Sequence, residues 1–170
     1  MKTSIFLLTI LAGFASAKGP TTRIEVKSAG LSRPIEITDP EVLAGFNVWA
    51  GPGTSSDEPQ SLIVDWKKGI VAEPSKELTR YEVSFSAKFP EERVVYVVTY
   101  CYDAAAGRGY VYLPGKGEPR YSVNVSSILR FNEGNWFVAW ARWDKVIRPR
   151  LTERVQGDPR GPGGPPHESR

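Results

Sequence analysis

The strongest constraint on the fold is the alternation of apolar and polar residues at positions 80–89. Every second position there carries an apolar side chain, namely Tyr81, Val83, Phe85, Ala87 and Phe89. A period of two is typical of a β-strand with one buried face. The following stretch at 94–102 is apolar on both faces, which favours a central strand. These two segments predict the centre of a β-sheet.

Short connections link these segments to a further expected strand. Pro90 suits a turn over residues 90–93. Gly107 and Gly109 then turn the chain into a strand expected at 110–113. Three consecutive strands with short connections form an antiparallel meander.

The remaining elements are shorter, and 16 Gly and 14 Pro argue against a helical bundle. Further strands are expected at residues 23–27, 34–37, 62–66, 121–125 and 136–139. Asp39 can cap a helix that begins at Pro40 and ends near Gly45. A second helix is expected over residues 141–147, because Pro149 would stop it. We therefore expect a mainly β fold, a β-sandwich or meander-like antiparallel sheet, with one or two short helices.

The first 17 residues have the pattern of a secretory signal peptide. Lys2 supplies the positive charge, residues 5–11 supply the apolar stretch, and small residues up to Ala17 supply the cleavage site. A membrane anchor is the alternative, but this apolar stretch is shorter than the roughly 20 residues that a span needs. We expect an exported chain, periplasmic or extracellular, without an integral membrane segment after cleavage.

The C-terminal residues have a different composition. Gly and Pro fill eight of the ten positions at 157–166. Such a segment buries too little apolar surface to offset its ordering entropy. We therefore expect one β-rich globular domain at residues 18–151 and a disordered tail at residues 152–170.

Charge and residue counts exclude several classes of function. The chain has 22 Lys and Arg against 19 Asp and Glu, a formal net charge of +3, which is too small and too evenly spread to indicate a nucleic-acid partner. The single His, His167, falls in the expected tail, and the single Cys, Cys101, falls within an expected strand. These counts predict no His-dependent nucleophile, no metal site and no cofactor, with Cys101 as a buried apolar side chain.

Paired carboxylates remain a possible catalytic device, because glycoside hydrolysis needs no His. The candidates lie near expected strand ends and loops: Asp39, Asp65, Asp103, Glu118 and Asp144. Asp65 lies next to Trp66, and Asp144 lies next to Trp143. No spacing singles out a pair, so turns and helix caps are the favoured interpretation.

Tyrosines are the richest feature of the expected meander. Tyr96, Tyr100 and Tyr102 share one face of one strand, and Tyr110 and Tyr112 share one face of the next. If the hairpin aligns them, these side chains form one aromatic surface for a sugar or a protein partner. The alternative is a core face whose hydroxyl groups reach the rim.

Two tryptophans flank an irregular region at residues 51–59, where we expect a binding lip. The candidate ligand-binding residues are therefore Tyr96, Tyr100, Tyr102, Tyr110, Tyr112, Trp49 and Trp66.

Several short motifs lie between the expected signal and tail, namely Ile37-Thr38-Asp39-Pro40, Phe46-Asn47, Trp49, Asp65-Trp66, Tyr112-Leu113-Pro114-Gly115, Gly117-Glu118-Pro119 and Ile128-Leu129-Arg130. Together they resemble an uncharacterised family of exported bacterial proteins. The resemblance covers residues 36–149. It implies a bacterial exported domain and no assigned activity, so it implies no functional residue.

The main functional hypothesis is a non-catalytic exported domain that binds an extracytoplasmic ligand or protein through an aromatic surface. One alternative is a carboxylate-dependent hydrolase of an envelope polysaccharide. The other is a passive structural protein of the envelope.

Overall fold

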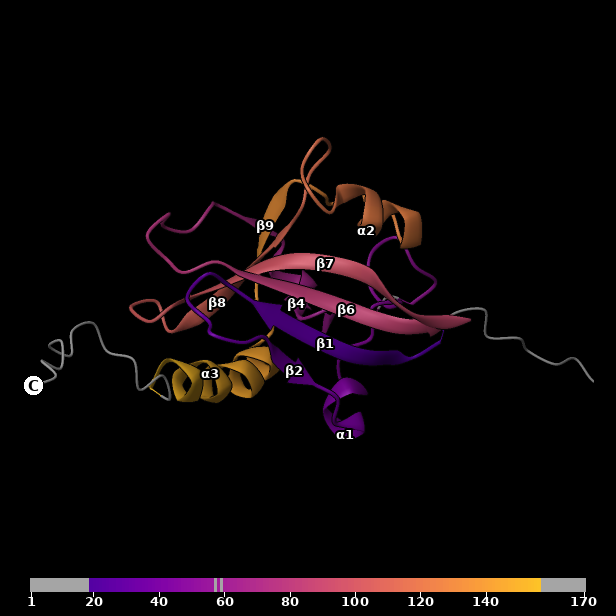
Figure 1. Ribbon diagram of the computed structural model, residues 1–170. Coiled ribbons are helices and arrows are strands. Elements are labelled where there is room, and N and C mark those ends of the chain that lie inside the picture. The colour runs from indigo at the N-terminus through magenta and orange to yellow at the C-terminus, as the bar shows by residue number, and fades with distance from the viewer. Residues whose placement is uncertain (1–18, 57, 59, 157–170) are drawn as a thin grey trace, which may run out of the picture.

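A seven-stranded antiparallel sheet forms the body of the molecule (Figure 1). The computed structural model describes residues 19–56, 58 and 60–156. In chain order the elements are β1 (Thr21–Lys27), β2 (Ile35–Ile37), α1 (Pro40–Leu43), β3 (Gln60–Ser61), β4 (Val64–Asp65), the 3₁₀ helix η1 (Trp66–Lys68), β5 (Ile70–Val71), β6 (Tyr81–Phe89), β7 (Glu91–Asp103), β8 (Arg108–Leu113), α2 (Tyr121–Ser127), β9 (Asn135–Val138) and α3 (Ala141–Gln156).

The predicted mainly β fold is confirmed. The large sheet has the order β2-β1-β6-β7-β8-β9-β5, and β3 with β4 forms a separate two-stranded sheet. The predicted meander is the consecutive set β6, β7 and β8. The turn between β6 and β7 is tighter than expected, because Phe89 pairs with Glu91 around Pro90. The helix capped by Asp39 is also confirmed, since the Asp39 carboxylate accepts a hydrogen bond from the Glu41 N–H at 2.9 Å.

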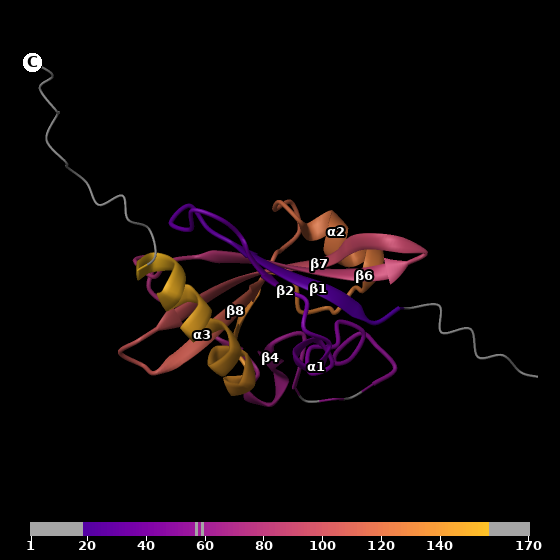
Figure 2. The same ribbon diagram turned by 60° about the horizontal axis from the view of Figure 1, so that its bottom comes forward.

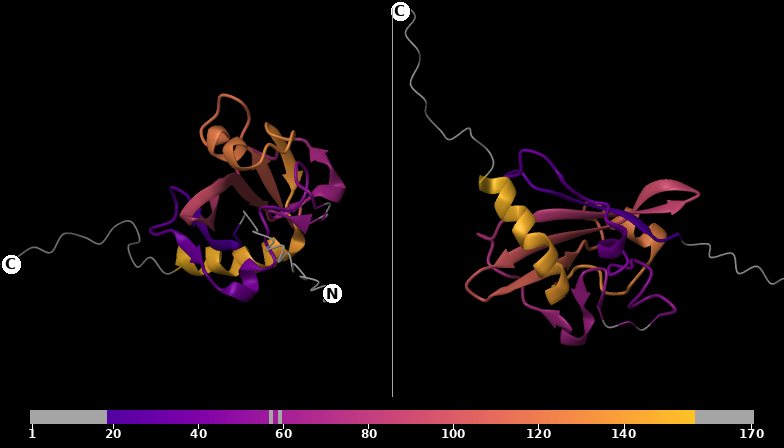
Figure 3. Two further views of the ribbon diagram at one scale, coloured as in Figure 1. Left: turned by 90° about the vertical axis from the view of Figure 1, so that its right-hand side faces the viewer. Right: turned by 90° about the horizontal axis from the view of Figure 1, so that it is seen from below.

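One face of the sheet carries the hydrophobic core. Antiparallel pairing sets Ile24 opposite Phe85, and Phe85 opposite Tyr96, so their side chains share this face. Helix α3 crosses the same face obliquely, as the right-hand view of Figure 3 shows. Its residues Trp143 and Ile147, one turn apart, are fully buried.

Helix α3 is longer than the sequence predicts. The predicted stop before Pro149 is wrong, because Pro149 lies inside a helix that continues to Gln156. Pro149 is exposed, whereas Leu151 is buried, so apolar packing carries the helix past a proline that faces solvent. The tail boundary at residue 152 is therefore also wrong. Residues 157–170 of the predicted tail, and residues 1–17 of the predicted signal peptide, lie outside the described residues.

The predicted strand at 121–125 is wrong, because these residues belong to helix α2. Strand β9, rather than this segment, pairs with β8. The predicted strand at 62–66 is broken as well. Leu62 and Ile63 have φ angles of 57° and 72°, and they form the tight turn between β3 and β4.

Helices α2 and α3 lie on opposite sides of the central strands (Figures 1 and 2). Helix α2 lies beside the part of β7 that β8 does not pair. There the Asn124 side chain is fully buried. It accepts a hydrogen bond from the Val97 N–H and donates one to the Val97 carbonyl, both at 2.7 Å. A side-chain amide thus pairs with β7 as a neighbouring strand would. None of the helices in the described part of the chain is long and apolar enough to cross a membrane.

Candidate functional site

The predicted surface of five tyrosines does not form, because the register of β7 and β8 separates them. Tyr100 pairs with Val111, and Cys101 pairs with Tyr110. Directly paired residues share a face. Tyr96, Tyr100 and Tyr102 therefore face α3, and Tyr110 and Tyr112 face the other side of the sheet. The prediction of one shared surface is wrong.

Tyr96 and Tyr100 belong to the core, since both are fully buried. The Arg130 guanidinium lies over the Tyr96 ring, 5.0 Å from its centroid. The Tyr100 hydroxyl donates a 2.8 Å hydrogen bond to Asp144. Burial raises the pKa of both phenols well above the ordinary range. These two side chains are therefore inaccessible to a ligand in this structure.

On the other face, Tyr110 and Tyr112 are held by neighbouring side chains. The Arg108 guanidinium lies over the Tyr110 ring at 5.5 Å and donates a 3.0 Å hydrogen bond to its hydroxyl. The Tyr112 hydroxyl donates a 2.7 Å hydrogen bond to Glu118. Desolvation and this bond raise the pKa of Tyr112 to about 12. Tyr112 also lines a small depression of about 230 Å³ beside α2.

Trp49 and Trp66 are half-buried, and the indole nitrogen of each donates a hydrogen bond within the protein. Trp49 Nε1 donates to the Gly19 carbonyl at 2.7 Å, and Trp66 Nε1 donates to Ser61 Oγ at 2.8 Å. The Trp66 ring also packs edge-on against Phe137, with centroids 5.1 Å apart. These contacts indicate that Trp49 and Trp66 anchor the loop at residues 51–56.

The same loop region is held by a buried arginine that the sequence did not single out. Arg130 is 1% exposed. Its guanidinium donates to the carbonyls of Ala50 at 2.9 Å and Pro52 at 3.1 Å, and also to that of Val48. Burial lowers the pKa of this guanidinium. Three carbonyl acceptors make Arg130 a structural clamp on the loop.

The candidate carboxylates mostly hold turns and packing contacts. Asp103 accepts a hydrogen bond from the Ala106 N–H at 3.0 Å, and Glu118 accepts one from the Gly115 N–H at 2.5 Å. Asp144 is buried and accepts hydrogen bonds from the Tyr100 hydroxyl and, at 3.0 Å, the Gly109 N–H. Its pKa is raised because burial disfavours the charged form. The partners of these three groups are parts of the fold.

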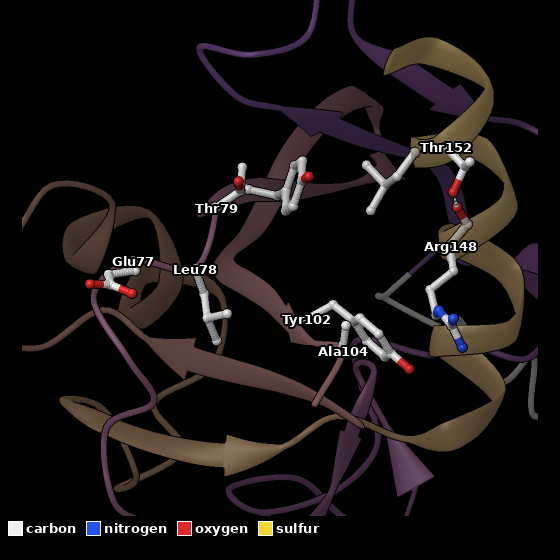
Figure 4. Close-up of a pocket in the computed structure, with 9 residues that line it drawn as sticks. Glu77, Leu78, Thr79, Tyr102, Ala104, Arg148 and Thr152 are labelled. Carbon is white, nitrogen blue, oxygen red and sulfur yellow. Dashed lines mark hydrogen bonds between the residues drawn. The ribbon is translucent and has the colours of Figure 1, made fainter. Parts of the chain in front are cut away.

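A groove of about 510 Å³ lies between the sheet and the C-terminal half of α3 (Figure 4). We call it the α3 groove. Its walls come from the segment before β6, the start of β6, the end of β7 with the turn that follows, and α3. The lining residues are Glu77, Leu78, Thr79, Tyr81, Tyr102, Ala104, Arg148, Leu151 and Thr152.

Helix α3 shapes this groove through two neighbouring rows of side chains. Trp143, Ile147 and Leu151 recur every four residues and face the sheet. Arg148 and Thr152 lie in the adjacent row and face the opening. Trp143 holds the start of the helix close to the strands, where its ring is 6.0 Å from that of Tyr100.

A glycine allows this close approach at the start of α3. A Cβ atom on Gly109 of β8 would lie 2.6 Å from the Tyr100 ring and would collide with the Asp144 carboxylate. The helix therefore touches the sheet near Gly109, whereas the groove opens farther along α3.

The groove combines an aromatic lining with one cation. Tyr81 and Tyr102 are both half-buried in its walls. The exposed Arg148 guanidinium stacks on the Tyr102 ring at 4.3 Å from its centroid. Figure 4 draws Glu77 and Arg148 on opposite sides of the opening. This is an amphipathic site, with an apolar middle and charges at its edges.

Only Tyr102 of the predicted binding residues lines this groove. Sequence reasoning missed Tyr81, Arg148 and Leu151 as site residues. The spacing of Trp143, Ile147 and Leu151 was the available signal, because it continues a helical row beyond Pro149. Cys101 is buried as predicted, and burial raises the pKa of its thiol.

The described residues contain no group of three or more His, Cys, Asp or Glu side chains that could hold a metal ion. Comparison with known proteins finds no matching family model, no matching curated protein and no matching solved structure. The geometry of the groove therefore carries the functional argument.

Proposed function

We propose that this chain is an exported, non-catalytic binding protein that holds a small ligand in the α3 groove. The observation that carries the proposal is the 510 Å³ opening with Tyr81 and Tyr102 in its walls. Binding sites for small molecules are concave, mostly apolar and roughly 300–1,000 Å³ in volume. The signal-like pattern of residues 1–17 supports export.

The role of the aromatic side chains supports binding rather than catalysis. Tyrosine gives a rigid apolar face with a polar edge, which suits reversible stacking. Asp144, the buried carboxylate of α3, already accepts hydrogen bonds from Tyr100 and Gly109. The groove therefore offers contact surface and one cation.

The proposal is tested by thermal unfolding of the full chain with a panel of amphipathic carboxylates, sugars, amines and short peptides. A ligand at a hundred times its dissociation constant stabilises the folded state by about 2.7 kcal/mol. For a domain of this size that raises the melting temperature by roughly 5–15 °C.

Two tryptophan substitutions localise the binding. Ala104 lines the groove, whereas Ala105 lies in the same exposed turn without lining it. Ala104→Trp fills the opening and should abolish the thermal shift, while Ala105→Trp should retain it. A panel with no saturable shift contradicts the proposal, and so does a shift that persists in Ala104→Trp.

A further inference from the structure

We infer, on the premise of the binding role proposed above, that the α3 groove selects small amphipathic carboxylates and that Arg148 binds the carboxylate. The ligand would have an apolar body, such as a phenyl ring on a short alkyl chain. The body would lie against Tyr81 and Tyr102, with the acid group at the α3 side of the opening.

The Arg148 charge lies against the aromatic wall of the groove. The guanidinium lies 4.3 Å from the centroid of the Tyr102 ring. A guanidinium stacked on an aromatic face keeps the N–H donors at its edge, and their fork matches the two oxygens of a carboxylate. Stacking therefore orients the Arg148 guanidinium and leaves the N–H groups at its edge able to donate hydrogen bonds.

Arg148 interacts electrostatically with the Asp144 carboxylate but forms no ion pair with it. Among the ion pairs of residues 19–156 that the structure describes, none includes Arg148. Asp144 is one turn away, but its two oxygens accept hydrogen bonds from Tyr100 and Gly109. The guanidinium is thus available to an anion from outside.

The remaining surface of the groove is mostly uncharged. Leu78 and Leu151 contribute aliphatic area, and Thr79 and Thr152 contribute hydroxyl groups. Glu77 is exposed and lies across the opening from Arg148 (Figure 4). A ligand that is anionic at one end and uncharged at the other would meet Arg148 and avoid Glu77. An apolar amine would have to bind in the reverse direction, with its ammonium group near Glu77 and its apolar end toward Arg148.

The test compares three ligands with one carbon skeleton: 4-phenylbutyrate, 4-phenylbutyramide and 4-phenylbutylamine. Their dissociation constants for the full chain are measured by isothermal titration calorimetry at neutral pH. We expect the carboxylate to bind at least about tenfold more tightly than the amide, which is the gain typical of a charge-assisted hydrogen bond. We expect the amine to bind more weakly than the carboxylate.

Arg148→Gln should remove the advantage of the carboxylate over the amide and leave the affinity for the amide nearly unchanged. Lys145→Gln is the matched control, because it removes a positive charge from the same helix at a residue outside the groove lining. This control should keep the advantage.

The outcomes separate this inference from the function on which it rests. Equal binding of carboxylate and amide, lost in Ala104→Trp, overturns the selection of carboxylates and leaves the binding role standing. Equal loss of advantage in Arg148→Gln and Lys145→Gln overturns the role of Arg148. If none of the three ligands binds, the inference fails, and the wider panel then decides the binding role separately.

Discussion

Helices α2 and α3 are attached to the sheet in different ways. Helix α2 is tied to β7 by one buried polar side chain, Asn124, through two hydrogen bonds to Val97. Helix α3 is attached by the apolar row of Trp143, Ile147 and Leu151, and the sheet also donates two buried hydrogen bonds to Asp144. Hydrogen bonds fix α2 at one point of a strand. Apolar packing holds α3 at its start and leaves space under its far end, where the groove forms.

The largest predicted effect concerns the attachment of α3. Trp143→Ala removes a fully buried ring that contacts Phe46 and Tyr100, with centroid distances of 5.4 and 6.0 Å. The free energy of unfolding should fall by roughly 3–5 kcal/mol, because a large cavity remains. Urea unfolding of the variant measures this loss. Trp140→Ala, at a half-buried neighbour, should cost clearly less, and equal losses would contradict a packing site centred on Trp143.

The attachment of α2 predicts the next effect. Asn124→Ala leaves the N–H and the carbonyl of Val97 without their partners, and each unpaired buried group costs about 1–3 kcal/mol. We expect a total loss of roughly 2–4 kcal/mol in urea unfolding. Ser126→Ala, at an exposed position of the same helix, should change stability by less than about 0.5 kcal/mol. Similar values for the two variants would show that Asn124 does not hold α2.

The polar contact of α3 predicts a dependence on pH. The folded pKa of Asp144 is raised above its unfolded value, so the folded state binds this proton more tightly. The resulting stabilisation is fully present below the unfolded pKa and is lost as the pH rises through the folded pKa. The stability advantage of the wild type over Asp144→Asn should therefore decrease from acid to neutral pH, by at most about 1.4 kcal/mol per pH unit. Urea unfolding of both proteins from pH 3.5 to 8 measures this difference, and a constant difference would contradict the assignment.

The smallest predicted effect concerns Pro149, the break in the backbone ladder of α3. The missing Pro149 N–H would have bonded the Lys145 carbonyl, four residues earlier. Two neighbouring carbonyls have side-chain donors, since Thr152 Oγ1 donates to the Arg148 carbonyl at 3.1 Å and Arg150 donates to the Val146 carbonyl at 2.5 Å. Pro149→Ala restores one backbone N–H, but it also increases the conformational entropy of the unfolded chain. We expect a net gain of about 1 kcal/mol in thermal unfolding. A loss of stability would indicate that the proline shapes the helix where it borders the groove.

The sequence predicted the parts of the fold that depend on local pattern. The alternation at 80–89 identifies β6 whatever its partners are, although Ser84 and Ser86 on its polar face are buried as well. The pattern at 121–125 led to a wrong prediction of a strand, because Tyr121, Val123 and Val125 also alternate with polar residues. The deciding contact there joins Asn124 to Val97, 27 residues earlier in the chain.

Most of the candidate site could not be predicted from the sequence, because it also depends on contacts between distant segments. A shift of one residue in the pairing of β8 with β7 moves Tyr110 and Tyr112 to the other face, and composition does not fix that register. The groove also needs the segment before β6 and the far end of α3 to meet. Only Tyr102 of the predicted binding residues lines it, because its strand position and its neighbours in α3 both had to be known.

The burial of Asn124 also decides how this protein can be produced. Asn124-Val125-Ser126 matches the acceptor sequence for N-linked glycans in a eukaryotic secretory pathway. In the folded chain the Asn124 side chain is fully enclosed, and its amide is bonded to Val97. An oligosaccharide attached to the nascent chain would have no room at this position and would keep α2 from docking. Yeast or mammalian secretion would therefore divide the product into unmodified folded protein and glycosylated misfolded protein, a division that bacterial expression avoids.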